Sequence, residues 1–257
     1  MNGDPARRNT LLDGTLIPPH RHELGQLLYP SAGVFSTTTE LGTWIAPADR
    51  ITWTPPGFLH YHRAYGKTDV RILEVPLELC DDLPGQPTVF AVSALLREAL
   101  LVLTSGRRLE DGRTDRLRQV VLDELVDVPE QSLYLPEPRD DRLRAVTDLL
   151  HADPANAANL AELGHAVGAS ERTLSRLFHS ELGMSFHRWR TLLRIQHALV
   201  HLVDGQPVTD TAMLCGWSNP TSFIEAFTAI LGQTPGRYQS RHPSLRPERT
   251  WRDSGIS

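Results

Sequence analysis

Histidines are the first residues whose type and spacing suggest chemistry. His20 and His22 stand two positions apart, so on a β-strand both imidazoles point to one face. His60, on a neighbouring strand, would complete a facial set for one divalent transition metal, with positions open for water or an effector. His62 is the weaker candidate, since only its spacing from His60 suggests a shared face. The alternative is that these are core or pocket histidines, satisfied by hydrogen bonds, that line an organic effector site.

A repeated pattern in the back half of the chain suggests a second kind of chemistry. A small residue is followed four positions later by a glycine and then by a capped helix. The two copies are Gly164, Gly168 and Ser170, and then Ala212, Gly216, Asn219 with Pro220. The small residue lets two helices cross closely, and the glycine permits the sharp turn between them. The pattern predicts two helix-turn-helix units.

The second helix of the first unit carries side chains that suit DNA. Its polar side chains recur at spacings of three and four and lie opposite Leu174, Leu177 and Phe178. An arginine on such a face can bind guanine bidentately. The expected contacts are Ser170, Arg172, Thr173, Ser175, Arg176 and His179, with Arg190 on the following helix. The alternative is that these are ordinary solvated charges.

The second unit is less basic than the first. Residues 171–194 hold five arginines and two acidic residues, whereas residues 204–225 hold three acidic residues and no lysine or arginine. The expected contacts here are Asn219, Thr221, Ser222 and Glu225. Phosphates repel a carboxylate, although glutamate can accept a hydrogen bond from cytosine N4. We therefore expect the first unit to supply most of the affinity, while Thr221 and Glu225 read few bases.

The back half resembles the AraC/XylS family of transcription regulators over about residues 143–238. The resemblance is carried by LAELGHAVGASERTLSRLFHSELGMSFHRWR, by VTDTAMLCGWSNPTSFIEAF and by LGQTPGRY. It implies two helix-turn-helix units, bridged by a long helix, that enter successive major-groove segments of double-stranded promoter DNA. It also implies a homodimer and contact with RNA polymerase. Glu225 and Thr228 depart from it, because the family commonly has a cation there.

The front half resembles the cupin superfamily. The residues that carry the first cupin motif are Gly14, His20, His22, Gln26 and Gly33, and those of the second are Pro55, Gly57 and His60. Two positions depart from the pattern: Gln26 stands where metal-binding cupins usually have a glutamate, and Ala64 replaces a polar residue. A neutral amide is a weaker ligand for a transition metal. The resemblance implies a sensor with a cupin-like β-barrel, in which His20, His22, Gln26 and His60 form a metal or effector site.

The expected fold is therefore α+β and multidomain. A cupin-like barrel with appended helices covers residues 10–128, a linker 129–139, an all-α double helix-turn-helix domain 140–240, and a disordered tail 241–257. Leucines at helical spacing within 89–127 predict two amphipathic helices after the sheet. By resemblance, these helices form the dimer interface through Leu96, Leu100, Leu103 or their neighbours; packing onto their own barrel is the alternative.

Composition limits the function classes. The net charge of −5 over 257 residues argues against a protein that coats nucleic acid by bulk attraction. Two cysteines, Cys80 and Cys215, argue against a disulfide framework or a cysteine zinc site. The sequence shows no signal peptide and no membrane span, so we expect a cytoplasmic protein.

The leading interpretation is a one-component transcription regulator, in which the front half senses a small molecule or metal ion and alters promoter binding. A rival is a cupin-type metal-dependent enzyme that activates oxygen at iron held by the histidines. A small-molecule oxygenase needs no reading helices, so we expect no enzyme. A third alternative is an architectural DNA-binding protein that responds to no effector.

Overall fold

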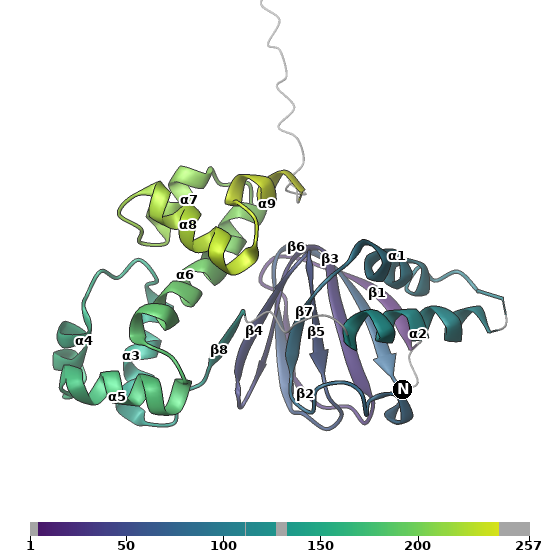
Figure 1. The fold of residues 1–257 in the computed structure, drawn as a ribbon, viewed down its shortest axis with the longest axis horizontal. Coiled ribbons are helices and arrows are strands. Elements are labelled where there is room, and N and C mark those ends of the chain that lie inside the picture. The colour runs from purple at the N-terminus through teal and green to yellow at the C-terminus, as the bar shows by residue number, and fades with distance from the viewer. Residues whose placement is uncertain (1–4, 111, 127–132, 242–257) are drawn as a thin grey trace, which may run out of the picture.

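The computed structural model describes residues 5–110, 112–126 and 133–241. Within them, the N-terminal region is a sheet of eight strands (Figure 1). The strands are β1 (Ala6–Leu11), β2 (Leu16–His20), β3 (Gly25–Thr39), β4 (Gly42–Pro47), β5 (Arg50–Thr54), β6 (His60–Val75), β7 (Thr88–Ala91) and β8 (Tyr134–Pro136), with a short 3-10 helix η1 (Leu77–Leu79) after β6. Strand β1 begins before residue 10, where the expected cupin-like domain starts, and β8 lies within the expected linker.

Two long strands organise the sheet. β3 and β6 pair antiparallel from Gly25 opposite Val75 to Thr39 opposite His60, with register shifts between Pro30 and Val34. β1, β5 and β7 extend one half of this pair, and β2, β4 and β8 extend the other. Among the described strands the sheet remains open, because its end strands do not pair with one another. The expectation of a closed barrel is therefore wrong, whereas the expected sheet-rich domain is confirmed.

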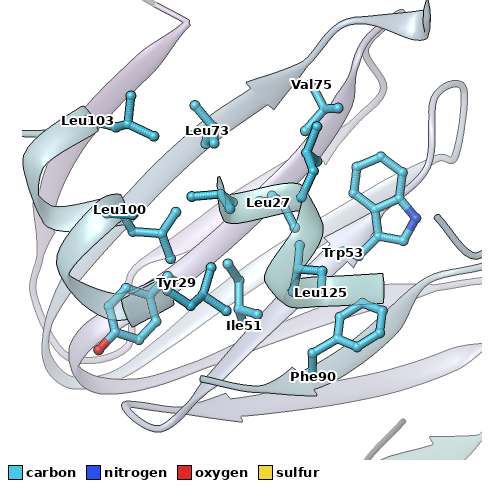
Figure 2. Close-up of a cluster of buried hydrophobic side chains, with 14 of the residues drawn as sticks. Leu27, Tyr29, Ile51, Trp53, Leu73, Val75, Phe90, Leu100, Leu103 and Leu125 are labelled. Atoms are coloured by element: carbon cyan, nitrogen blue, oxygen red, sulfur yellow. The ribbon is translucent and has the colours of Figure 1, made fainter. Parts of the chain in front are cut away.

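The outer face of the sheet is covered by α1 (Ala94–Leu103) and α2 (Arg113–Val126). Figure 2 shows leucines of these helices packed against Leu27, Trp53 and Leu73 of the strands. Leu96, Leu100 and Leu103 are all buried in this cluster. Each buried leucine contributes roughly 1.5–3 kcal/mol. In the structure these three leucines pack onto their own sheet, which is the alternative to a place in a dimer interface.

The inner face combines an apolar cluster with polar side chains. Phe35 and Ala64 are buried opposite one another on β3 and β6, and Leu28, Val70 and Ile72 complete the cluster. Because strand side chains alternate between faces, His60 and His62 share this face with Ala64. The histidines thus lie at one end of an apolar inner surface.

The C-terminal region is helical, as expected (Figure 1). Its helices are α3 (Asp141–Ala152), α4 (Leu160–Ala166), α5 (Glu171–Leu182), α6 (Phe186–Val203), α7 (Val208–Leu214), α8 (Pro220–Leu231) and α9 (Pro235–Arg241). α4 with α5 form the first unit, and α7 with α8 form the second. The predicted long helix over 186–203 is confirmed at both ends. The expected tail lies outside the described residues.

Part of the expected linker is a strand of the sheet. β8 pairs with β4, the Tyr134 ring stacks on Trp44 with centroids 4.5 Å apart, and the Tyr134 hydroxyl donates to Leu41 O at 2.6 Å. Residues 127–132 of the linker lie outside the described part. Since β8 leads within five residues into α3, the sheet edge is connected to the helical region by a short and paired segment.

A shared apolar core also joins the two regions. Val34 and Ile45 of the sheet are buried in one cluster with Leu199 and Leu202 of α6. The same cluster contains Phe227 of α8, with other side chains of the second unit. The sheet therefore packs on α6 and on the second unit. None of the described helices is long and apolar enough to cross a membrane.

Candidate nucleic-acid interface and histidine cluster

The first unit presents a polar face on α5. Arg172, Arg176 and His179 are exposed there and form no hydrogen bond or ion pair with any described residue. With Thr173 and Ser175 they line one shallow surface hollow. The spacing predicts Arg172, Ser175, Arg176 and His179 on one face, and the structure places them around this hollow together with Thr173, the fifth expected contact. Free arginines along the first turns of an exposed helix can reach phosphates and base edges.

The position of α5 follows from packing behind that face. Leu174, Leu177 and Phe178 are buried in the core of the first unit, and Ser170 caps the helix through its Oγ, which accepts from Thr173 N at 3.1 Å. Gly164 lies directly under the turn, where a Cβ would stand 2.4 Å from Ala169 O. The predicted small residue and cap of this unit are thus confirmed.

The second unit repeats the construction with a different surface. Asn219 Oδ1 accepts from Ser222 N at 2.9 Å, and Pro220 occupies the first turn of α8. Thr221, Ser222 and Glu225 are exposed. Glu225 pairs with no cation among the described residues. The exposed face of α8 therefore presents hydroxyls and one carboxylate where α5 presents two arginines.

Arg190 has a place in the structure that its spacing alone did not reveal. Its guanidinium donates to Ala158 O at 2.8 Å and lies over the Phe186 ring, 4.6 Å from the centroid. Arg194, one turn later, donates from Nε to Pro154 O at 2.9 Å and from Nη2 to Asn156 O at 3.0 Å. Both arginines thus hold the connection between α3 and α4, and burial lowers the pKa of each.

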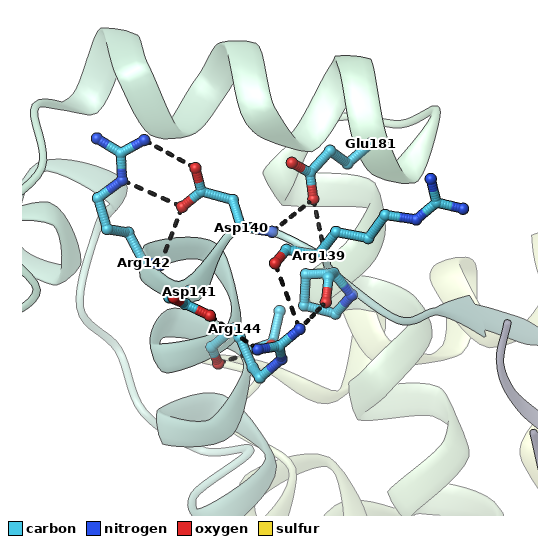
Figure 3. Close-up of polar contacts among 8 residues, drawn as sticks. Arg139, Asp140, Asp141, Arg142, Arg144 and Glu181 are labelled. Atoms are coloured by element: carbon cyan, nitrogen blue, oxygen red, sulfur yellow. Dashed lines mark hydrogen bonds and ion pairs between the residues drawn. The ribbon is translucent and has the colours of Figure 1, made fainter. Parts of the chain in front are cut away.

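Glu181, near the end of α5, fixes the start of α3. Its Oε2 accepts from Arg139 N at 2.8 Å and from Asp140 N at 3.1 Å (Figure 3). Asp140 caps α3 and pairs with Arg142, whose hydrogen bond lowers the Asp140 pKa to about 2. Helix α5 of the first unit is therefore connected to the residues that follow β8. Sequence reasoning missed Glu181, which lies 41 residues from Asp140.

Four imidazoles converge at one end of the inner face. Ring centroids lie 4.4 Å apart for His20 and His60, 4.8 Å for His60 and His62, and 4.9 Å for His22 and His60. One ring nitrogen from each of His20, His60 and His62 lies within 4.8 Å of the others. We call these four residues the histidine cluster. His62, the weaker candidate by spacing alone, is one of the three histidines whose ligand atoms lie closest together, and His22 lies beside them.

Hydrogen bonds fix which nitrogens face one another. The Nδ1 atoms of His20 and His60 lie 2.9 Å from the carbonyl oxygens of Pro18 and Phe58, and His62 Nδ1 lies 3.1 Å from Thr37 Oγ1. A carbonyl oxygen only accepts, so Nδ1 of His20 and of His60 carries the proton and Nε2 keeps its lone pair. Metal-binding histidines are commonly oriented in this way by their second nitrogen.

Burial favours the neutral form of three of these histidines, which are His22, His60 and His62. It lowers the His60 pKa to about 4 and the His62 pKa well below its ordinary value, with further lowering by neighbouring imidazoles. Burial also lowers the His22 pKa. Among the described residues no hydrogen-bond partner reaches His60 Nε2, His22 Nε2 or Gln26 Oε1, although all three atoms are buried. Neutral imidazoles with free lone pairs are ready ligands for a metal ion.

Fold and sites together define the class. The structure is a helix-turn-helix DNA-binding protein, with a sheet-rich N-terminal domain docked on its linking helix and on its second unit. A family model described as a helix-turn-helix domain matches residues 163–241. The HTH-type transcriptional regulator NimR of Escherichia coli (strain K12) is 33% identical over 239 residues, which cover 92% of this chain and 87% of that protein. The chain belongs to the AraC family of transcriptional regulators.

Solved structures include more distant likenesses. ToxT from Vibrio cholerae O395 aligns over 93% of this chain and 98% of its own, with 10% identity and a TM-score of 0.41. A transcriptional regulator with an AraC-type DNA-binding domain, from Chromobacterium violaceum, aligns over 41% of this chain and 95% of its own, with 22% identity and a TM-score of 0.38.

Proposed function

We propose that this regulator senses a divalent transition metal ion at its histidine cluster and converts occupancy into a change in promoter binding. The observation that carries the proposal is the convergence of His20, His60 and His62, whose ligand atoms lie within 4.8 Å of one another. Each of the three also has its Nδ1 engaged, which leaves Nε2 for an ion. His22, whose ring centroid lies 4.9 Å from that of His60, stands beside this set as a further ligand or as a group that binds a coordinated water. Gln26 enters the proposal through its buried Oε1, which has no hydrogen-bond partner among the described residues.

The donor chemistry fits a transition metal. Imidazole nitrogen suits Zn²⁺, Cu²⁺, Fe²⁺ and Ni²⁺, whereas Ca²⁺ and Mg²⁺ prefer oxygen ligands. Three histidines would hold Zn²⁺ with one position left for water or for a ligand of the ion. His60 and His62 are both buried, and His60 Nε2 has no hydrogen-bond partner among the described residues. A bound ion supplies the positive charge and the coordination bonds that the buried lone pairs lack.

The same strands that carry the histidines touch the helical region. His62 and Tyr65 lie on β6, and Tyr65 packs against the cluster shared with α6. The next residue, Gly66, lies against Asp204 at the end of α6, where a Cβ would stand 3.2 Å from Asp204 Oδ1. A small shift of β6 on metal binding would therefore reach α6, which separates the two units. Such a shift is effective only if the ion binds one domain arrangement more tightly than another.

Metal analysis tests this proposal. Untagged protein should bind about one equivalent of Zn²⁺ in equilibrium dialysis. His60→Ala and His62→Ala should each lose that binding, because removal of one of three ligands leaves an incomplete set. The matched control is His165→Ala, which removes an exposed histidine on α4 and should leave stoichiometry unchanged. Wild-type protein that binds no metal, or histidine variants that bind as the wild type does, would contradict the proposal.

An organic effector is the second candidate. Phe35 lies beside the cluster, 5.0 Å from His62 between ring centroids, and an apolar surface continues to Leu28 and Ile72. A small aromatic or carboxylate ligand would find both an apolar wall and imidazole donors there. A metal-free protein that shifts its thermal unfolding with such a compound, but not with Zn²⁺, would favour this candidate.

The histidines sense and do not catalyse, which the regulator relative supports by matching 92% of the chain. The protein acts in the cytoplasm as a homodimer and contacts RNA polymerase at promoters.

Leu95, on the outer side of α1 and 56% exposed, is the leucine that we assign to the dimer contact. Sedimentation of Leu95→Glu should show a monomer; a dimer of wild-type stability would exclude Leu95.

A further inference from the structure

A cleft lies between α6, the second helix-turn-helix unit and the connection from α3 to α4. It is lined by one side of α6, by the turn before α8, by the first half of α8 and by Ala157 of the α3–α4 connection. Its volume is about 500 Å³. Its polar lining residues are His187, Arg190, Thr191, Arg194, Ser218 and Ser222. No acidic residue is among the lining residues, in contrast with the exposed face of α8.

The two arginines in this cleft bond to backbone oxygens, and Asp153 is the acidic residue whose charge acts on Arg194. Arg190 and Arg194 are half-buried, and their hydrogen bonds go to the carbonyl oxygens of the α3–α4 connection. Neither forms an ion pair with a described residue. A guanidinium has five N–H donors, so donors remain for a further acceptor. A half-buried cation without an ion pair favours an anion that enters the same space.

The cleft is built rigidly. Gly216, with φ of 79°, lies against the α3–α4 connection, where a Cβ would stand 2.7 Å from Ala155 Cα and 2.8 Å from Arg194 Nη2. Arg194 also lies 5.7 Å from the centre of the Trp217 ring. One connection thus contacts α6 and the turn of the second unit together. These contacts pack the connection, α6 and the second unit closely around the cleft.

The sheet leaves this side of α6 open. Ile195, Leu199 and Leu202 of α6 face the sheet, whereas His187, Arg190, Thr191 and Arg194 face the cleft. At about 100° per residue these two sets lie on different sides of the helix. Ser222 belongs both to the cleft and to the exposed face of α8. The cleft is therefore continuous with the surface through which the second unit would meet DNA.

We propose that this cleft is a third DNA contact, which binds the sugar-phosphate backbone that lies between the major-groove segments met by α5 and α8. The inference rests on the proposed function, because it requires both units on one duplex. Helices in successive major-groove segments on one face of DNA have the intervening backbone between them. The cleft places two arginines, one histidine and several hydroxyls at that point. Contacts of this type set register and affinity and read no sequence.

The test compares two substitutions at one position. The DNA is a set of duplexes selected from a randomised pool by the full-length wild-type protein, with and without Zn²⁺. Thr191→Glu introduces a negative charge into the cleft, and Thr191→Gln introduces a neutral side chain of the same shape. Both lose the bond from Thr191 Oγ1 to His187 O equally. We expect Thr191→Glu to bind about tenfold more weakly than Thr191→Gln at low salt, because each phosphate contact is strongly charge dependent.

A second measurement separates charge from folding. Arg190→Gln should reduce the slope of log affinity against log salt by about one, as expected for one lost phosphate contact. Arg116→Gln, which removes an exposed arginine from α2, should leave the slope unchanged. Ethylation of the phosphates between the two groove contacts should block binding. Equal binding by Thr191→Glu and Thr191→Gln, without ethylation interference, would overturn the inference and leave the proposed function standing. A wild-type protein that selects no duplex would instead overturn the proposed function.

Discussion

Gln233, just after α8, donates a hydrogen bond from Nε2 to Asp49 Oδ2 of the sheet at 2.8 Å. These residues lie 184 positions apart and join the N-terminal domain to the second unit. Asp49 also pairs with Arg50, which is almost fully buried. Behind this pair, Tyr238 of α9 is fully buried beside Phe227 of α8. The second unit is thus docked on the sheet by a specific polar contact and by an apolar core.

Loss of this contact should weaken communication between the domains. In Gln233→Ala the Asp49 carboxylate loses one donor, and a hydrogen bond to a charged group contributes roughly 1.5–3 kcal/mol. We expect the ratio of DNA affinities with and without Zn²⁺ to move toward one. Gln119→Ala is the matched control, since Gln119 donates to Asp123 at 2.9 Å within α2, where no DNA-binding element lies. An unchanged ratio in Gln233→Ala would show that this contact transmits nothing.

The two units should contribute unequally to DNA binding. Arg176→Ala removes an exposed cation from the face of α5, and we expect a loss of affinity of about tenfold or more, which corresponds to roughly 1–3 kcal/mol for a guanine contact. Glu225→Ala removes a carboxylate that phosphates repel, so its effect should be small or favourable. Both are measured by titration of the same selected duplex. A larger loss for Glu225→Ala would reverse the assignment.

The pairing of β8 with β4 should depend on the glycine at position 42. Gly42 has φ of 147°, and a Cβ there would stand 2.3 Å from Leu135 O, so Gly42→Ala should displace β8 from β4. Hydrogen exchange of β8 amides should then rise by about tenfold or more, as should proteolysis near the linker. Gly106→Ala is the control, because Gly106 also has a positive φ of 72° but faces open space. Similar exchange in both variants would mean that backbone strain, and not β8 displacement, is responsible.

Acid should destabilise the fold through His197, a half-buried histidine of α6. Burial lowers the His197 pKa to about 4, with further lowering by His151 and His201. The ordinary value of about 6.5 applies to the unfolded chain, so the unfolded state binds the proton first. The stability that neutral His197 contributes is complete above about pH 6.5 and is lost as pH falls toward 4.

Unfolding by urea at pH 7 and pH 5 measures this effect. The loss of unfolding free energy between the two values should be smaller in His197→Gln than in the wild type. His60 and His62 share the direction of shift, so a reduced pH dependence will remain in the variant. His165→Gln, at an exposed position of α4, should keep the full wild-type dependence. If the unfolding free energy of His197→Gln changes between pH 7 and pH 5 as much as that of the wild type, the lowered pKa of His197 is contradicted.

The helical region could be predicted closely from sequence because its signals are local. Ser170 and Asn219 cap helices, Pro220 starts one, and Gly168 and Gly216 have positive φ, as their positions indicated. Each of these effects depends on a few neighbouring residues. The sheet was predicted only in outline. Strands β1 and β8 form through pairing with residues that lie 57 to 94 positions away, which no local pattern reveals.

The candidate site residues could likewise be predicted where the signal is local, and not where it depends on distant segments. The face of α5 follows from helical periodicity, so Arg172 and Arg176 could be placed from spacing alone. His62 was ranked low because its membership depends on how β2 pairs with β6, where a register shift brings His20 opposite His60. Arg194 and Glu181 act through backbone atoms of distant segments, and an arginine or a glutamate in a helix gives no sign of that partner. Long-range packing decided what the sequence left open.

Metal bound at the histidine cluster should change the affinity for DNA. The measurement is the affinity of the full-length protein for its selected duplex in Zn²⁺ and in chelator, for the wild type and for His60→Ala. Coupling between two sites is typically about 1–3 kcal/mol. We therefore expect the wild-type affinity to change about fivefold or more with Zn²⁺, and the His60→Ala affinity not to respond. A wild-type affinity that is the same in both conditions, or an equal response in His60→Ala, would contradict this prediction.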